Sequence, residues 1–242
     1  MIELKDLTKR YGEFPAVNDL NLCVKKGEVF GFIGPNGAGK TTTIKMMGGI
    51  LEPTKGVVKI AGIDMQAEPE KAKGKIGFIP DRPYLYEKLT GREFLKFTAD
   101  LYGVTEDAFE ASAFRILKDF SLADWADELV ESYSHGMKQR LIMSAALLHN
   151  PEVIIVDEHM VGLDPAAMMM VKGLFRKLAG QGVTVFMSTH TLKVAEETCD
   201  RIGVINKGCL IAMGTTQELQ REANITEADL ERVILNLTNN NS

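Results

Sequence analysis

The sequence is poor in cysteine, in clustered basic residues and in long apolar runs, and each shortage excludes a class of protein. The three cysteines, Cys23, Cys199 and Cys209, are odd in number and scattered, so they form neither a disulfide framework nor a metal-ligand pattern. Lysine and arginine total 28 against 33 aspartate and glutamate residues, and no basic block is present that would grip a nucleic-acid backbone. No stretch approaches the ~20 consecutive apolar residues that cross a bilayer. We therefore expect a protein of a reducing cytosol, with no nucleic-acid partner and no membrane span of its own.

What the sequence does contain is a glycine-rich stretch at residues 34–41, GPNGAGKT, which fits the pattern G-x-x-x-x-G-K-[ST]. We expect an apolar strand just before it, at residues 29–33, and a helix just after it, at residues 42–47. Glycines let successive backbone N–H groups turn toward an anion, and the helix N-terminus adds partial positive charge. The pattern places Lys40 at the β- and γ-phosphates of a nucleotide and the Thr41 hydroxyl at Mg²⁺. A plain glycine-rich turn is the weaker alternative, because the strand, the lysine and the threonine all stand at the required offsets.

Two roughly alternating stretches precede this loop, at residues 2–7 and 17–24, and they predict an antiparallel hairpin. Tyr11 lies in the turn between them. It could stack on a nucleotide base or be an ordinary surface tyrosine, and the local sequence favours neither. Beyond the loop helix we expect a short strand at residues 57–60 and a turn at residues 62–64.

Residues 84–150 are mostly helical in pattern, within a chain that otherwise alternates strands and helices. Thr90 and Glu93 form a capping box at the start of one helix, and Ser134 is the expected N-cap of another. These features predict a helical subdomain inserted into a larger domain.

A continuous apolar run at residues 153–156 predicts a buried parallel strand that delivers Asp157 and Glu158 to its carboxyl end. Asp157 is the expected partner of the phosphate loop at Mg²⁺, and Glu158 could polarise an attacking water as a general base. Another buried strand, at residues 182–187, leads to His190 on the same edge of the sheet. The predicted fold class is α/β. It comprises a P-loop NTPase core with a mixed, mainly parallel sheet, an N-terminal antiparallel β subdomain and an inserted helical subdomain.

In the order of these motifs the chain resembles the ATP-binding cassette (ABC) ATPases over nearly its whole length. Residues 134–137 resemble the family's signature sequence, residues 162–165 its D-loop, and His190 its switch histidine. Asp81 lies where the family usually has its Q-loop glutamine, and Tyr11 matches the aromatic residue that stacks on adenine. The resemblance implies an ABC ATPase domain at residues 1–214, with the helical insertion at 84–150, and a C-terminal helical tail at 215–242.

The resemblance also implies that two such domains pair head to tail. Each ATP then lies between the phosphate loop of one copy and the signature helix of the other, whose first N–H groups form an anion site. The implied catalytic residues are Lys40, Glu158 and His190. The implied Mg²⁺ ligands are Thr41, Asp81 and Asp157. The implied nucleotide contacts are Tyr11, Asn36, Gly37, Ala38, Gly39, Lys40, Thr41, Thr42, Ser134 and Gly136. In the family's arrangement Asp164 would link the two ATP sites.

The chain departs from the family pattern at a few positions. Asp81 keeps an oxygen for Mg²⁺ or water but adds negative charge near the phosphates. Tyr133, His135 and Met137 stand where Leu, Gly and Gln are commoner. His135 could add a hydrogen-bond donor to the phosphate, or it could be a tolerated surface substitution. Because Glu158 is retained, we expect an active ATPase.

The family resemblance implies an ATPase subunit of a membrane transporter, peripheral on the cytoplasmic face of the membrane. Its partners would be a separate transmembrane permease subunit and a second copy or a homologous ATPase. The loop after Asp81 and the helices at 84–102 would receive a cytoplasmic helix of the permease. Residues 133–140 and the short tail resemble subunits of ABC-2-type exporters, which favours export.

Two other functions compete with transport. A soluble ABC ATPase that acts on ribosomes or DNA is disfavoured by the single cassette, the lack of a heptad run and the net negative charge. A small GTPase or nucleoside kinase would explain the phosphate loop but would leave residues 134–137 unexplained.

Overall fold

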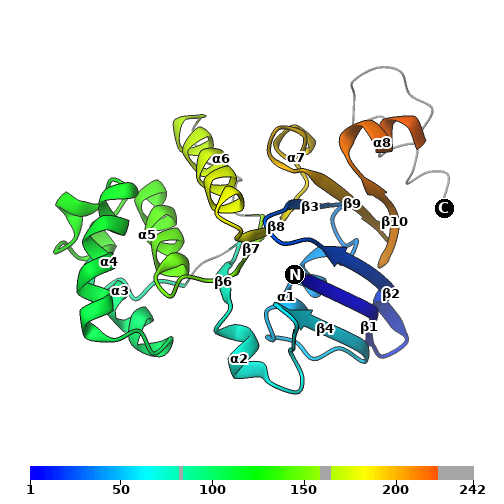
Figure 1. The fold of residues 1–242 in the computed structure, drawn as a ribbon, viewed down its shortest axis with the longest axis horizontal. Coiled ribbons are helices and arrows are strands. Elements are labelled where there is room, and N and C mark those ends of the chain that lie inside the picture. Colours follow the sequence, from blue (N-terminus) through cyan, green and yellow to red (C-terminus); the bar gives the residue numbers. More distant parts are fainter. Residues whose placement is uncertain (82–83, 159–164, 223–242) are drawn as a thin grey trace.

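The computed structural model describes residues 1–81, 84–158 and 165–222, and their strands form two sheets with helices around them (Figure 1). The larger sheet has six strands in the order β10-β9-β3-β8-β7-β6. Its strands are β3 (Val29–Ile33), β6 (Ile76–Ile79), β7 (Val153–Asp157), β8 (Thr184–Thr189), β9 (Arg201–Asn206) and β10 (Cys209–Gly214). All neighbours are parallel except β10, which pairs antiparallel with β9. The predicted mixed, mainly parallel sheet is confirmed.

The smaller sheet is antiparallel, with four strands in the order β2-β1-β4-β5. Its strands are β1 (Ile2–Tyr11), β2 (Phe14–Val24), β4 (Lys55–Ile60) and β5 (Ile63–Asp64). The predicted hairpin is confirmed, and its strands extend up to the two-residue connection Gly12-Glu13. The turn expected at residues 62–64 is wrong at its second half, because Ile63 and Asp64 pair with β4 as a short edge strand.

Side-chain alternation along the large sheet explains how one sheet serves two cores. Val29 and Ile33 of β3 face one core, which contains the helices of the insertion, while Phe30 and Phe32 face the other. That other core is closed by the antiparallel sheet and by α1 (Lys40–Met47). Successive residues of a strand point to opposite faces, so a fully apolar strand is stable only where both faces are covered.

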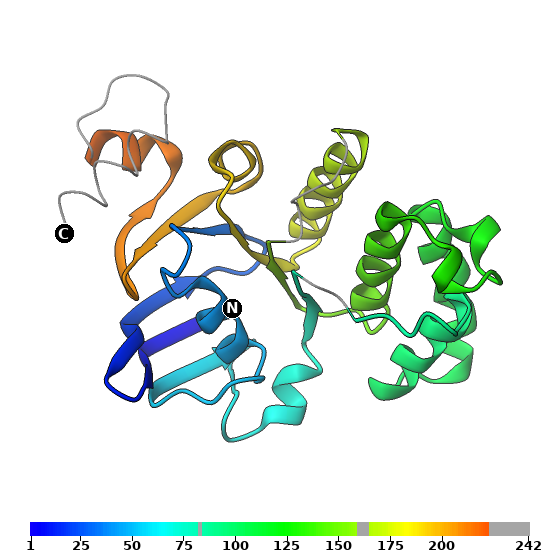
Figure 2. The same ribbon diagram turned by 180° about the vertical axis from the view of Figure 1, so that it is seen from behind.

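The inserted helices are α3 (Gly91–Leu101), α4 (Glu106–Asp119) and α5 (His135–Leu147), with two short 3₁₀ turns at Ala123–Trp125 and Val130–Ser132. Both ribbon views place these helices beyond the β6 edge of the large sheet (Figure 2). The predicted capping box is present, since Thr90 Oγ1 accepts from Glu93 N and Thr90 N donates to the Glu93 carboxylate. The Ser134 hydroxyl accepts from Met137 N at 3.3 Å, which confirms Ser134 as the N-cap of α5.

The remaining helices are α2 (Pro69–Lys73), α6 (Pro165–Gly180), α7 (Leu192–Thr198) and α8 (Thr216–Glu222). Pro165 begins α6 as the sequence predicts, whereas the predicted N-cap, Asp164, lies outside the described residues. So does most of the predicted helical tail, at residues 223–242. Within the part of the chain that is described, no helix has the length and apolar character needed to cross a membrane.

Candidate nucleotide-binding site

The glycine-rich loop connects the buried strand β3 to helix α1, and the helix begins at Lys40, two residues earlier than predicted. Gly39 is the N-cap residue, with φ of 108°, and no side chain in the described structure caps this helix end. The first backbone N–H groups of α1 are therefore available to an anion, where the helix dipole is also favourable.

Two glycines of the loop are required by its geometry. A Cβ on Gly34 would lie 2.2 Å from the backbone oxygen of Ile205, and one on Gly39 would lie 2.5 Å from that of Ala16. The loop is thus packed against the backbone of two other strands and leaves no space for a side chain at either position. This packing fixes the loop before any ligand arrives.

Lys40 is only 4% exposed and its ammonium group lies inside the loop. Nζ donates to the carbonyl oxygens of Gly34 at 2.8 Å and Pro35 at 3.2 Å, and it lies 3.4 Å from Oε1 of Glu158. A phosphate bound in the loop would compete with Glu158 for this ammonium group.

Asp157 and Glu158 stand at the carboxyl end of β7, as predicted, and a single hydroxyl holds both. Ser188, at the equivalent point of β8, donates from Oγ to Asp157 Oδ1 at 2.7 Å and accepts from the backbone N–H of Glu158 at 3.2 Å. Glu158 has φ of 47°, a left-handed conformation that is costly for a residue with a side chain and that is found mostly at functional sites. Sequence reasoning missed Ser188, although it stands two residues before His190.

The environment of Asp157 raises its pKa, chiefly by burial, with further increases from the nearby charges of Glu158 and Asp81. Hydrogen bonds from Ser188 and from the Thr41 hydroxyl act in the opposite direction. Thr41, Asp81 and Asp157 are therefore within electrostatic reach of one another, as the predicted metal site requires. His190 lies on the other side of Glu158, with Nδ1 3.1 Å from Oε2.

These residues line one hollow of about 440 Å³, a volume suited to a small-molecule ligand. Its lining residues are Tyr11, Phe14, Ala16, Asn36, Gly37, Gly39, Lys40, Thr41, Thr42, Asp81, Asp157 and Glu158. Of the predicted contacts within this copy, Ala38 is buried beneath the loop rather than in the lining. Phe14 is an addition that the sequence did not reveal. It faces Tyr11 across the hairpin, and both rings are exposed, so two aromatic faces are available at one end of the hollow.

The sequence pattern that defines the ABC transporter family matches residues 17–161. The chain belongs to the ABC transporter ATPases. It is 38% identical to the linearmycin resistance ATP-binding protein LnrL of Bacillus subtilis over 90% of this chain and 70% of that protein. It is 39% identical to the bacitracin transport ATP-binding protein BcrA of Enterococcus faecalis, over 95% of this chain and 74% of BcrA. A match to "Probable multidrug ABC transporter ATP-binding protein YbhF" of Escherichia coli, at 38% identity, covers 92% of this chain but 38% of that protein.

Solved structures of ABC ATPases share the whole fold. The structure described as the ATP-binding subunit of an ABC transporter superposes with a TM-score of 0.92, at 34% identity, over 98% of this chain and 99% of that one. The dimeric ABC transporter cassette MJ0796 superposes with a TM-score of 0.81, at 30% identity, over 89% of this chain and 98% of that one. The chain is therefore an ATP-binding and ATP-hydrolysing subunit with the predicted cassette fold.

The signature segment of this ABC ATPase lies apart from the nucleotide hollow of the same copy. Ser134 and His135 are exposed at the N-terminus of α5, and neither they nor Gly136 line that hollow. A Cβ on Gly136 would meet nothing within 4 Å, so the helix tip has open space on that side. Tyr133, in contrast, is buried, and its hydroxyl donates to Trp125 O at 2.5 Å. The departure at Tyr133 thus serves packing inside the helical subdomain.

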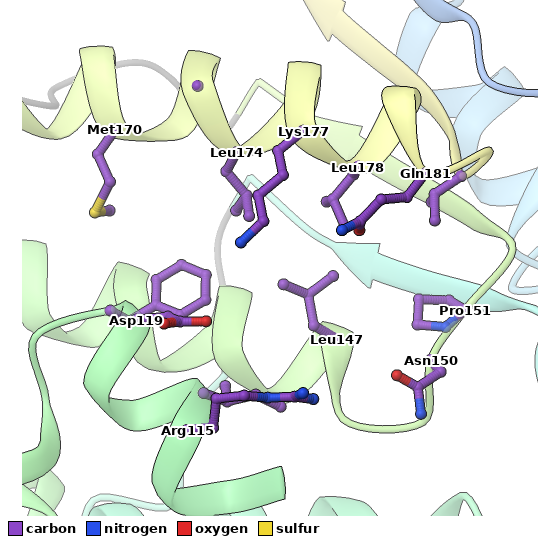
Figure 3. Close-up of a pocket in the computed structure, with 14 residues that line it drawn as sticks. Arg115, Asp119, Leu147, Asn150, Pro151, Met170, Leu174, Lys177, Leu178 and Gln181 are labelled. Atoms are coloured by element: carbon purple, nitrogen blue, oxygen red, sulfur yellow. The ribbon is translucent and has the colours of Figure 1, made fainter.

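Two other hollows flank the cassette's helical subdomain. One, of about 1010 Å³, is lined by residues 84–89 and by α3 and α5, and it shares Asp81 with the nucleotide hollow. The other, of about 550 Å³, lies between α4, the chain after α5 and α6 (Figure 3). Its floor is apolar, and it contains none of the predicted site residues.

Proposed function

We propose that this chain powers an exporter as one of two cassettes that close head to tail on ATP. The observation that carries the proposal is the separation of two half-sites on one copy. The phosphate loop lines an open hollow on one side, and the exposed N-terminus of α5, with Ser134 as its cap, is elsewhere. Each half-site binds anions by the same physics, because N–H groups at a helix start are unpaired within the helix. A second copy would bring Ser134 and Gly136 to the γ-phosphate.

The donors around Thr41 fit Mg²⁺. Thr41, Asp81 and Asp157 offer only oxygen ligands, which hard divalent cations prefer, and Thr41 already contacts Asp157. No group of three acidic, histidine or cysteine side chains in the described residues could hold a metal ion by itself. A few protein oxygens completed by phosphate oxygens are typical of Mg²⁺ bound together with a nucleotide. The ion would supply charge stabilisation at the phosphates.

Within this site the chain's own side chains have distinct tasks. Lys40 holds the β- and γ-phosphates, and the Asn36–Thr42 stretch surrounds them with N–H groups. Glu158 accepts a proton from the attacking water, and Ser188 fixes the backbone from which Glu158 projects. His190 orients Glu158 through the contact at 3.1 Å and adds a polar group beside the γ-phosphate. Tyr11, with Phe14 beside it, provides a face for the adenine ring.

We assign the ATPase domain to residues 1–214, with the helical insertion at 84–150, and a C-terminal tail to residues 215–242. The partner is a transmembrane permease at the cytoplasmic face of the membrane, docked in the hollow beside residues 84–89. The names of BcrA, a bacitracin transport protein, and of LnrL, a linearmycin resistance protein, support export over import.

A Glu158→Gln variant tests the head-to-tail arrangement, because it keeps the shape of the site but removes the base. Gel filtration with ATP and Mg²⁺ should shift this variant from monomer to dimer, and ADP should not. Adding Ser134→Arg, which places bulk at the exposed helix tip, should abolish the shift. If the doubly substituted protein dimerises as well as Glu158→Gln alone, Ser134 does not face the second copy and the arrangement is wrong.

A further inference from the structure

The hollow beside residues 84–89 contains an exposed aromatic cluster, which we call the aromatic ridge and define as Tyr84, Tyr86 and Phe97. The rings are arranged edge to face, with centroids 5.7 Å apart for Tyr84 and Tyr86 and 5.2 Å apart for Tyr86 and Phe97. Tyr84 is 84% exposed, and the other two are also largely open to solvent. Grouped aromatic rings on a surface typically mark an interaction site.

Gln139 of α5 also lines this hollow, and it carries an unsatisfied acceptor. The side chain is 5% exposed, and within the described structure nothing pairs with Oε1. Leaving a buried polar atom without a partner typically costs 1–3 kcal/mol, so such atoms are rare unless a ligand or partner satisfies them. The chain therefore carries a built acceptor site in the same hollow as the aromatic ridge.

The charges of the hollow favour a positively charged donor. Both lysines of the lining are in ion pairs, Lys138 with Glu87 at 2.5 Å and Lys88 with Glu131 at 2.6 Å. Asp81 lines this hollow as well as the nucleotide hollow, and its charge acts on Asp157. A cation that enters beside Asp81 would be attracted there and would weaken the repulsion between the two carboxylates.

We infer that the permease segment that docks in this hollow is a short helix with a lysine or arginine that donates to Gln139 Oε1 beside Asp81. The inference rests on the proposed function, since it specifies the chemistry of the permease surface that the cassette accepts. A helix suits the hollow better than an extended strand, because helices and side chains form the walls and no sheet edge is offered. Its apolar face would cover the aromatic ridge.

Asp81 makes this docking contact electrostatic as well as steric. Its carboxylate has two oxygens, so one can face the docking cation while the other stays toward the Mg²⁺ site. A docked cation would therefore be felt at Asp157 through Asp81. Glutamine at this position could transmit only a hydrogen bond.

Photocrosslinking from the ridge identifies the docking segment. Tyr84→p-benzoylphenylalanine tolerates the larger ring because the side chain is exposed, and the full chain can be expressed in its native membranes and irradiated. Mass spectrometry should find a cytoplasmic segment of a polytopic membrane protein, with Lys or Arg within one helical turn of the crosslink. A membrane-protein segment with no such residue overturns the inference and leaves the proposed function intact. Crosslinks only to residues 223–242 or to a second copy also overturn it, and crosslinks to no membrane protein contradict the proposed function itself.

Variants of Gln139 test the acceptor directly, with a synthetic peptide of the crosslinked segment as the probe. Gln139→Met keeps the shape but removes the acceptor, so peptide affinity should fall at least about tenfold. Gln139→Glu keeps an acceptor and adds charge, so affinity should be retained or increased. The unfolding temperature of Gln139→Met should rise by ~2–4 °C, because an unsatisfied buried atom has been removed. Unchanged affinity in Gln139→Met, or loss of affinity in Gln139→Glu with the fold intact, overturns the inference.

Discussion

Ser188 is the side chain on which both acidic residues of the catalytic site depend, and its removal gives the sharpest test of the site's geometry. Ser188→Ala deletes the donor to Asp157 Oδ1 and the acceptor for Glu158 N, while it changes the volume of a side chain that is 1% exposed by one oxygen atom. Ser144→Ala is a matched control. That serine is equally buried, but its hydroxyl donates only to Arg140 O within α5.

The expected magnitudes differ because the partners differ in charge. A hydrogen bond to a charged group contributes about 1.5–3 kcal/mol and a neutral one about 0.5–1.5 kcal/mol, so Ser188→Ala should lose about 3 kcal/mol of unfolding free energy. The control should lose about 1 kcal/mol. For a chain of this length these losses correspond to unfolding temperatures lower by ~6–12 °C and ~2–4 °C. Substitutions that misalign a metal-binding carboxylate typically reduce metal affinity or activity 10- to 100-fold, and we expect a loss of that order in Ser188→Ala.

The assay is ATP turnover as a function of Mg²⁺ concentration, at a temperature where all variants are folded. Ser188→Ala should need more Mg²⁺ for half-maximal turnover and reach a lower maximum, whereas Ser144→Ala should match the wild type in both. Ser188→Thr keeps the hydroxyl and should recover most of the loss. The reasoning is refuted if Ser188→Ala turns over ATP with the wild-type Mg²⁺ dependence, or is no less stable than the control.

Three further outcomes are expected. Lys40→Ala should abolish ATP hydrolysis in a steady-state assay while circular dichroism stays unchanged, and measurable turnover would remove Lys40 from the phosphate site. Burial lowers the pKa of His149 below its ordinary 6.5, so the folded state binds this proton less readily than the unfolded state, and unfolding free energy should fall as pH decreases below about 6.5, by at most about 1.4 kcal/mol per pH unit from this group. Urea titrations of His149→Gln should show a shallower dependence between pH 7 and 5, and an equal slope would exclude His149 as the cause. Gly34→Ala should lose more than about 2 kcal/mol, since its Cβ would meet Ile205 O at 2.2 Å, whereas Gly136→Ala should cost less than about 0.5 kcal/mol in the same titration.

Local patterns in the sequence predicted the parts of this cassette that depend on local physics. The phosphate loop, the buried strand that ends in Asp157 and the N-caps Thr90 and Ser134 all follow from spacing within a few residues. Those rules concern hydrogen bonds and burial along one stretch of chain, so a single sequence contains them.

Features that need two distant stretches were not predictable in the same way. Ser188 reaches Asp157 only because β7 and β8 are neighbours in the sheet, and Gln139 lacks a partner only because of what surrounds α5. Phe14 joins Tyr11 through the register of a hairpin whose strands are longer than the alternation suggests. The short helix α2 was not predicted, since its five residues, PEKAK, have little apolar periodicity.

The hollow in Figure 3 has walls that belong to two parts of the cassette, with Arg115 on α4 and with Lys177 and Leu174 on α6. Any tilt of the helical subdomain against the sheet would change how much water this space holds. Solutes too large to enter, such as polyethylene glycol, would then favour whichever orientation has the smaller hydrated volume. The catalytic cycle of this ATPase would be sensitive to osmotic pressure, through a part of the molecule that touches neither nucleotide nor cargo.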